Sequence, residues 1–548
     1  MRSSGNQRKI QVLKNFLFPY LPFNLITMKK LLLLLLATLY ACSSNSDQFD
    51  LLIVNGTVYD AENRSFYEAD LGIKGDKIEK IGNLENASAK KTIDASGHVV
   101  SPGFIDMHAH IEAIMNMPSA ENFVKQGVTT VLAGPDGRGP SPMKSFLDSL
   151  ETFDLGLNTA WLVGHNAIRR NVMGTENREP STEELEAMKA AVQEAMDNGA
   201  YGISTGLKYV PGSFSKIDEV VALSEVAAES GGIYTSHLRE EGLGLLDGVR
   251  EAIEIGREAN IPIILTHHKA IGRPMWGASV KTLAMVDSAR TLGIDVMMDQ
   301  YPYTASSTGL SVLIPTWAMA GGQAEFKKRV DDPATRKKIH EEIMFNIEYD
   351  RGGADLAVVQ FASVSWKSDL NGKTLKDWAI ERGLEPNFKN GADLVIEGQL
   401  NGGASCIFHA IGEEDVKRIM QHPLAMVASD GGLAQPGQGH PHPRSYGTFP
   451  RVLGHYVRNE NTISLELALA KMTSIPADRL GLSDRGFIKE GAQADITIFD
   501  PEKVDEGGSF EDPHHYPKGI PFVIVNGKLT VDSGNLTKER AGSVLRKR

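Results

Sequence analysis

The sequence predicts an α/β protein built on a (β/α)8 barrel. Apolar segments of strand length alternate with helical patterns, such as Thr182 to Asn198, through most of the chain. These segments end in polar residues, as expected for a barrel that places its chemistry at the carboxyl ends of its strands. The expected strand ends are His110, Asp136, His165, Lys208, His237, His267, the Tyr301–Tyr303 turn and Asp430.

Two β-rich runs near the ends of the chain predict a second, smaller domain. Leu51 to Asp60 and Phe522 to Asp532 each contain Asn-Gly between apolar residues, which is a hairpin signal. Ala492 to Asp500 supplies a further strand, so we expect the two termini to fold together into a small β-sandwich. The expected bounds are 49–102 and 484–537 for the sandwich and 103–483 for the barrel.

The stretch from about residue 311 to 423 is too long for a single barrel connection. It contains a helical pattern at 336–350. We therefore expect an inserted subdomain over the mouth of the barrel.

Composition narrows the choice of function. The 548 residues carry a formal net charge of −12, which gives no support to nucleic-acid binding. Only two cysteines occur, Cys42 and Cys406, so neither a disulfide framework nor a cysteine-rich zinc site is available. Any metal ion must be held by histidine, carboxylate or a modified lysine.

Residues 1–48 are expected to be a targeting leader and linker rather than part of the fold. Met28-Lys29-Lys30 precedes an apolar core of leucines and then small residues, which describes a secretory signal with Met28 as its start. Leu39-Tyr40-Ala41-Cys42 resembles a bacterial lipobox, whose cysteine is lipidated. The apolar run is shorter than the ~20 residues of a spanning helix. We expect an exported lipoprotein, in the periplasm or at the cell surface, that meets the membrane only through this anchor; simple secretion is the alternative.

Histidines at the expected strand ends indicate a metal site. His108 and His110 end one apolar run, and residues two apart on a strand point to the same face. His237 and His267 end two further strands, and Asp430 ends the eighth. This combination suits one or two divalent ions, zinc foremost, with a position left open for water.

Several motifs resemble those of the amidohydrolase superfamily and, within it, the N-acyl-D-amino-acid deacylases. The resemblance runs from about residue 50 to 535 and implies metal-dependent removal of the acyl group from an N-acyl-D-amino acid. The strands that carry the metal ligands are shared by the whole superfamily. Thr266–Lys269, Asp299–Tyr303 and the His440–Arg444 region are more diagnostic of the deacylases. The matching segments are Pro102–His110, Gly202–Leu207, Thr266–Lys269, Asp299–Tyr303, and His440–Arg444 with Gly447–Arg451.

The resemblance implies roles for individual residues. His237 and His267 would hold the tighter metal ion, and His108 with His110 would form the second position. Asp430 would ligate metal, take a proton from water and pass it to the departing amine. The implied clamp for the substrate α-carboxylate consists of Lys269, Tyr301, Ser307 and Arg444.

One departure from the family pattern affects the metal site. The family carries a cysteine ligand after the second strand, where this chain has Asp136 in Gly134-Pro135-Asp136-Gly137. A carboxylate is a harder ligand than a thiolate and can shift the metal preference. Lys208 lies near the place where other superfamily members carry a carboxylated, bridging lysine. Asp136 and Lys208 are both candidate replacements, and one or two metal ions are both compatible with the sequence.

Two other functions compete with deacylation. One is a cyclic-amide hydrolase or D-dipeptidase on the same scaffold. The other is a non-catalytic lipoprotein that binds small acyl-amino acids, which the combination of histidines with Asp430 argues against and Asp136 keeps open. His165 is given no role beyond a contact to substrate.

Overall fold

The computed structural model describes residues 48–547. The expected leader, with its start at Met28 and the lipidated Cys42, lies outside these residues apart from Gln48. Within 48–547, no helix is both long enough and apolar enough to cross a membrane.

Eight parallel strands close into a barrel, which confirms the expected fold. Each strand pairs with its neighbours in sequence order, and the ring closes where Gly431 pairs with Ala109. The strands are β6 (Phe104–His110), β7 (Val128–Ala133), β8 (Asn158–Trp161) continued by β9 (Val163–Gly164), β10 (Gly202–Gly206), β11 (Ile233–His237), β12 (Ile263–Leu265), β13 (Val296–Gln300), and β17 (Ala425–Val427) continued by β18 (Gly431–Gly432).

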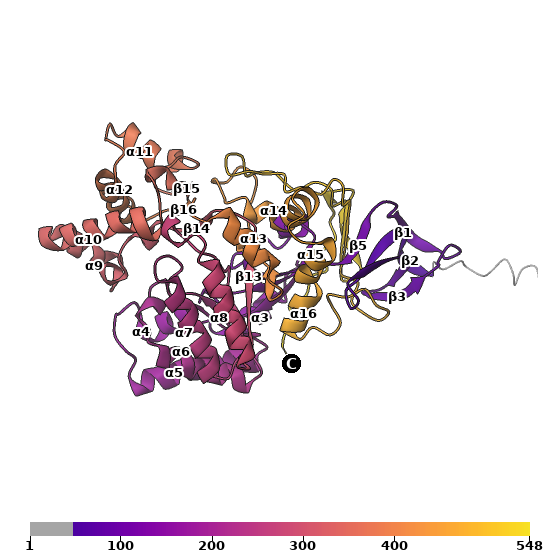
Figure 1. Cartoon of the computed structure of the whole chain (residues 1–548). Coiled ribbons are helices and arrows are strands. Elements are labelled where there is room, and N and C mark those ends of the chain that lie inside the picture. The colour runs from indigo at the N-terminus through magenta and orange to yellow at the C-terminus, as the bar shows by residue number, and fades with distance from the viewer. Residues whose placement is uncertain (1–47, 548) are drawn as a thin grey trace, which may run out of the picture. The chain divides into compact units, whose positions relative to one another are not determined.

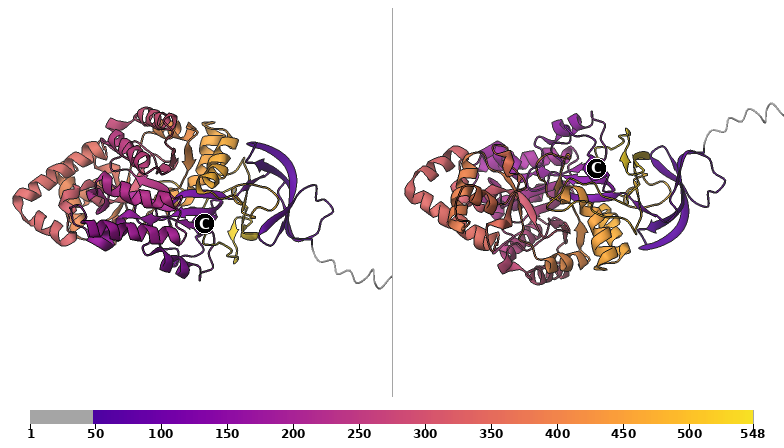
Figure 2. Two further views of the ribbon diagram at one scale, coloured as in Figure 1. Left: turned by 90° about the horizontal axis from the view of Figure 1, so that it is seen from below. Right: turned by 90° about the horizontal axis from the view of Figure 1, so that it is seen from above.

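Helices between the strands pack around the barrel (Figure 2). The helix expected near Thr182 to Asn198 runs from Thr182 to Asp197 as α5, and it starts at a capping box formed by Ser181 and Glu184. The other barrel helices are α3 (Met143–Leu150), α4 (His165–Met173), α6 (Ile217–Glu229), α7 (Leu245–Glu258), α8 (Ser279–Thr291), α13 (Glu413–Gln421), α15 (Leu465–Met472) and α16 (Ser474–Leu480).

Strands from both termini share one nine-stranded sheet, so the termini do fold together. The antiparallel pairing of Val99 with Phe499 and of Val100 with Ile498 joins the two parts. Apolar residues from both parts form a common core beneath the sheet. The strands are β1 (Phe49–Asp60), β2 (Ser65–Lys74), β3 (Lys77–Gly82), β4 (Ala89–Asp94), β5 (Val99–Pro102), β19 (Ile496–Phe499), β20 (Phe522–Val525), β21 (Lys528–Asp532) and β22 (Asn535–Leu536).

The two Asn-Gly pairs have different outcomes. Asn526-Gly527 forms the tight turn between β20 and β21, as expected. Asn55-Gly56 forms no hairpin and instead makes a bulge inside the continuous strand β1. Asn55 takes a left-handed φ of 59°, and its backbone N–H donates to Asp70 of the neighbouring strand over 3.0 Å. Pairing with β2 on both sides of the bulge keeps the strand continuous.

An inserted subdomain follows the seventh barrel strand. It holds a three-stranded antiparallel sheet in the order β14 (Ser306–Gly309), β16 (Ser405–Phe408), β15 (Val359–Ser363). Its bounds differ from the expected 311–423, because β14 begins earlier and α13 packs against β17 and α8 as a barrel helix. Helices α9 to α12 group beside this sheet in Figure 1: α9 (Gln323–Asp331), α10 (Pro333–Phe345), α11 (Leu375–Glu381) and α12 (Phe388–Leu400).

A buried polar network links the sandwich to the barrel. Asp495, just before β19, forms an ion pair with Arg485 and accepts a hydrogen bond from Asn158 of β8 over 3.0 Å. The backbone N–H of Asn526 donates to the other carboxylate oxygen over 2.7 Å. Both oxygens of this buried carboxylate are engaged at the junction, so Asp495 holds the two domains together.

Replacing Asp495 with alanine should lower the thermal unfolding midpoint by several degrees, measured by circular dichroism. The substitution leaves Arg485 buried without its partner, and breaking a buried ion pair costs about 3–5 kcal/mol. Asp484→Ala is the matched control, because this half-exposed carboxylate lies 3.8 Å from Lys77 and contributes little. Equal shifts for the two variants would contradict the structural role given to Asp495.

Candidate metal centre and active site

Six side chains from five barrel strands or the turns after them meet at the mouth of the barrel. His108, His110 and His237 lie on β6 and β11 themselves. Asp136, His267 and Asp430 follow β7, β12 and β17 by two or three residues, so they sit on turns rather than at strand ends as expected. The strand ends nevertheless bring all six together.

Three of these residues adopt a backbone conformation that is uncommon outside glycine. The φ angles are 54° at Asp136, 37° at His267 and 49° at Asp430. The surrounding structure holds these turns: the N–H of Asp430 donates to the carbonyl of His108 over 2.8 Å, closing the barrel. Backbone strain of this kind gathers at functional sites, where it aims side chains into a cavity.

The six side chains form two groups that share Asp136. In the first group, His110 Nε2 lies 3.5 Å from Asp136 Oδ2 and 3.2 Å from Asp430 Oδ1. His108 Nε2 lies 3.5 Å from Asp136 Oδ1. In the second group, His237 Nδ1 and His267 Nε2 are 2.7 Å apart, and they lie 3.6 and 3.4 Å from the carboxylate of Asp136.

This set of donors fits one or two divalent metal ions. Neither ring nitrogen of His108 has a hydrogen-bond partner, and neither has Asp136 Oδ1, although all three atoms are buried. Buried polar atoms are rarely left unpaired, because the loss of water is then uncompensated. Imidazole nitrogens and carboxylate oxygens in a closed cluster are the ligands that zinc takes in enzymes.

The pKa shifts of His108, Asp136 and Asp430 are those of metal ligands. The pKa values of His110 and His267 are raised, because neighbouring carboxylates outweigh the effect of burial. Burial lowers the pKa of His108 to about 3, so its imidazole is neutral at pH 7. Burial alone would raise the pKa of Asp136, but His108, His237 and His267 outweigh that effect and hold it well below its usual range. Burial opposes ionisation of Asp430 too, yet Arg444 and the histidines keep its pKa below the ordinary value. Both aspartates are therefore carboxylates.

Glu241 supports both histidines of the second group, a role the sequence analysis did not identify. Its two carboxylate oxygens lie 3.1 Å from His267 Nδ1 and 3.4 Å from His237 Nε2, the ring nitrogens that face away from the cluster. Lys269 donates to the same carboxylate over 2.5 Å. A carboxylate behind a ligand histidine fixes its orientation and raises its basicity.

Asp106 and Asp299 hold the backbone of the metal-binding turns, and their role was also missed. Asp106 accepts from the N–H groups of His108 and Ser429 over 3.1 and 2.9 Å, and Asp299 accepts from that of His267 over 2.6 Å. Burial raises the pKa of Asp106 to about 7 and that of Asp299 to about 8. The sequence signals were that both residues lie on apolar barrel strands and within the family motifs Pro102–His110 and Asp299–Tyr303.

Of the two candidates for the missing cysteine, the structure brings Asp136 into the cluster and leaves Lys208 outside it. Lys208 Nζ lies 2.8 Å from Glu240 and 3.6 Å from Asp350. These two carboxylates engage the ammonium away from the histidines. His165 starts α4 and pairs with buried Glu219 over 2.8 Å, and it does not line the cavity over the cluster.

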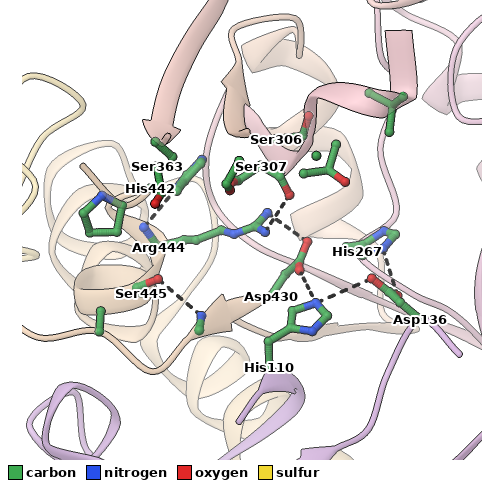
Figure 3. A pocket seen from close by; sticks show the side chains of 18 of the residues that line it. His110, Asp136, His267, Ser306, Ser307, Ser363, Asp430, His442, Arg444 and Ser445 are labelled. Carbon is green, nitrogen blue, oxygen red and sulfur yellow. Dashed lines mark hydrogen bonds and ion pairs between the residues drawn. The ribbon is translucent and has the colours of Figure 1, made fainter. Parts of the chain in front are cut away.

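A cavity of about 560 Å³ opens over the cluster, and most of the expected carboxylate clamp lines it. Arg444 NH1 lies 2.8 Å from Asp430, and its NH2 donates to the carbonyl of Ser307 over 3.2 Å (Figure 3). Tyr301 does not line this cavity; its ring packs 4.7 Å from the Arg444 guanidinium and 5.6 Å from Lys269 Nζ. The arrangement gathers positive charge beside a metal cluster.

Fold and site together are those of a metal-dependent hydrolase. The family model described as "Amidohydrolase family" matches residues 91–531. The chain belongs to this family, as its motifs predicted.

Relatives of known function span almost the whole chain. D-aminoacylase of Alcaligenes xylosoxydans xylosoxydans is 34% identical over 92% of this chain and 98% of its own length. N-acyl-D-glutamate deacylase of the same organism is 35% identical over 91% and 97%. The crystal structure of N-acyl-D-glutamate deacylase from Bordetella bronchiseptica, complexed with zinc and a phosphonate inhibitor, matches with a TM-score of 0.78, 32% identity, and 91% and 100% coverage. A D-hydantoinase structure, 17% identical with a TM-score of 0.54, shares the fold.

Replacing His237 with alanine should lower the zinc content of the purified protein, because a site with few protein ligands loses affinity steeply with each one removed. Elemental analysis of the folded protein measures this directly. His268→Gln is the matched control: His268 follows His267 in sequence, but its Nε2 pairs with Thr282 over 2.8 Å. Full zinc content in His237→Ala would remove this residue from the metal site.

Proposed function

We propose that the protein removes the acyl group from N-acyl-D-amino acids in a zinc-dependent hydrolysis. The observation that carries the proposal is the position of Asp430 between the two parts of the site: its Oδ1 lies 3.2 Å from His110 and its Oδ2 lies 2.8 Å from Arg444. The candidate base Asp430, beside the metal ligands, thus adjoins the Arg444 guanidinium, which can bind the α-carboxylate of the substrate. The deacylase relatives support the same reaction.

The two groups of ligands would hold the metal. His237, His267 and Asp136 form one position, and His108, His110, Asp136 and Asp430 form the other. A bound zinc ion polarises a carbonyl oxygen and lowers the pKa of water towards 7. Asp136 belongs to both groups, so either one ion or two can be accommodated.

The remaining steps belong to the side chains. Arg444 attracts the α-carboxylate, since a planar guanidinium can bind both of its oxygens. Lys269, whose ammonium is held by Glu241 and His267, adds positive charge nearby. Asp430 accepts a proton from the attacking water and delivers it to the nitrogen of the departing amino acid. Because Asp430 and Arg444 touch, the amine leaves beside the cation that holds its own carboxylate.

The other candidate functions receive less support. Each deacylase relative described above acts, by its name, on acylated amino acids, whereas the similarity to D-hydantoinase extends to the fold alone. A non-catalytic binding protein does not require an intact cluster of ligands. Turnover of N-acyl-D-amino acids, but not of their L-enantiomers, by the zinc-loaded protein tests the proposal, and inactivity towards the whole D-series with both short and long acyl groups would overturn it.

Asp430→Asn should reduce turnover by ~10² or more, the scale for losing general acid–base catalysis. The amide cannot accept the proton of water, so the rate falls while the fold and the zinc bound at His237 and His267 are kept. Steady-state kinetics with elemental analysis checks both. Asp369→Asn, at an exposed site on the insert, is the control. Near-normal turnover of Asp430→Asn would assign the base to another residue.

We also propose that the protein is exported and anchored through lipid on Cys42. The support is the lipobox-like Leu39 to Cys42 and the basic and apolar segments before it. In a bacterial host, labelled palmitate should enter the full chain and not Cys42→Ala, with Cys406→Ala as the matched control. An unmodified N-terminus produced by cleavage elsewhere would contradict the proposal.

A further inference from the structure

A second cavity, of about 700 Å³, opens beside the metal site. It shares Asp136, Arg138, Tyr209 and Val312 with the first cavity, so the two adjoin. Tyr209 stands at this junction: its ring lies 4.5 Å from that of His237, and its hydroxyl is 3.0 Å from that of Thr308. Tyr209 thus lies between the metal site and the second cavity.

Large apolar side chains that are partly exposed to solvent face this second cavity. Leu243 is 42% exposed and Phe345 is 50% exposed, and both line it. The half-buried Trp317 lies in the same wall. Exposed large apolar residues that gather around a hollow mark a place where an apolar ligand is bound.

Apart from Arg138, whose guanidinium lies 5.8 Å from the Tyr209 ring at the junction of the two cavities, charged groups of the wall are engaged with the protein. Lys208 is paired with Glu240 over 2.8 Å, and Glu342 accepts from the indole N–H of Trp317 over 3.0 Å. Arg170 donates to the carbonyl of Val210 over 3.0 Å. The side chains left to receive a ligand are therefore the apolar ones and, at the junction with the first cavity, Arg138.

The orientation of the bound substrate follows from the order of the residues that line the first cavity. Contacts run from Arg444 through Asp430 and His110 to Asp136 (Figure 3). The α-carboxylate at Arg444 and the departing nitrogen at Asp430 place the amino acid at one end of this series. The acyl chain extends from the other side of the scissile bond, towards Asp136, where the second cavity opens. Neither Arg444 nor Lys269 lines that cavity.

We propose that the second cavity is the acyl site and that it takes a linear apolar acyl chain of medium length, such as octanoyl. This inference rests on the proposed deacylase function and specifies its substrate class. An acetyl group is too short to pass Tyr209, whereas a longer chain buries its methylenes against Leu243, Trp317 and Phe345. Each methylene buried in an apolar pocket adds to the discrimination between substrates.

The test compares N-acetyl and N-octanoyl derivatives of the same D-amino acid with the zinc-loaded enzyme. The value of kcat/KM should be at least about tenfold higher for the octanoyl substrate, given the usual effect of added methylenes. Hydrolysis of the acetyl substrate with equal or poorer use of the octanoyl one would overturn the acyl site and leave the deacylase function standing. No hydrolysis of either substrate would count against the deacylase function itself.

A substitution in the cavity wall locates the effect. Phe345→Asp should reduce the ratio of octanoyl to acetyl kcat/KM several-fold, because a charge replaces the apolar contact. Phe153→Asp is the matched control, since Phe153 is a 37% exposed phenylalanine outside both cavities. Leu243→Asp provides a second, independent change in the wall. An unchanged ratio in Phe345→Asp and Leu243→Asp would place the acyl group elsewhere.

Discussion

The mouth of the barrel is arranged around the carboxylate of Asp136, which is the one ligand common to both groups of donors. Four histidines lie within 3.6 Å of its two oxygens. A buried carboxylate in this position is tolerable only where positive or metal charge surrounds it, because burial otherwise favours the neutral acid. The turn that carries Asp136 has little conformational freedom. Gly137 has a φ of 73°, and a Cβ added there would meet the Asn166 side chain at 2.1 Å, so only glycine fits beside Asp136.

Further carboxylates behind the site turn this arrangement into a rigid unit. Asp106 and Asp299 accept hydrogen bonds from backbone N–H groups of residues that carry ligands. The Glu241 carboxylate lies behind two ligand imidazoles, within 3.4 Å of both. A site built from separate strands depends on such support, since small displacements of ligands are costly for both metal affinity and rate. The inserted subdomain adds the wall of the second cavity through Phe345 at the end of α10. The barrel thus supplies the reactive groups, and the insert supplies part of the surface that selects the substrate.

Sequence reasoning located the barrel and the histidines because both follow local rules. His108 and His110 are recognisable from strand alternation, and His237 from its place at the end of an apolar run. The choice between Asp136 and Lys208 was beyond that reasoning, since it depends on how the turns fold after their strands. Glu241 was missed for the same reason: a turn after β11 brings it back behind its own histidine. The hairpin expected at Asn55-Gly56 was wrong, because the same dipeptide makes a hairpin or a bulge according to the partner strand. Local sequence does not specify that partner.

The pairing of β5 with β19 constrains when the chain can finish folding. Val99 and Phe499 lie at opposite ends of the sequence, with the whole barrel between them. The first five strands emerge from the ribosome long before β19 to β22 exist, so they spend synthesis with an unpaired edge and an incomplete core. Contacts of such long sequence separation form late, because the loop between them must close first. The nine-stranded sheet can therefore be completed only after the last strands have been synthesised. A chain truncated before residue 496 would leave the N-terminal strands without their partner.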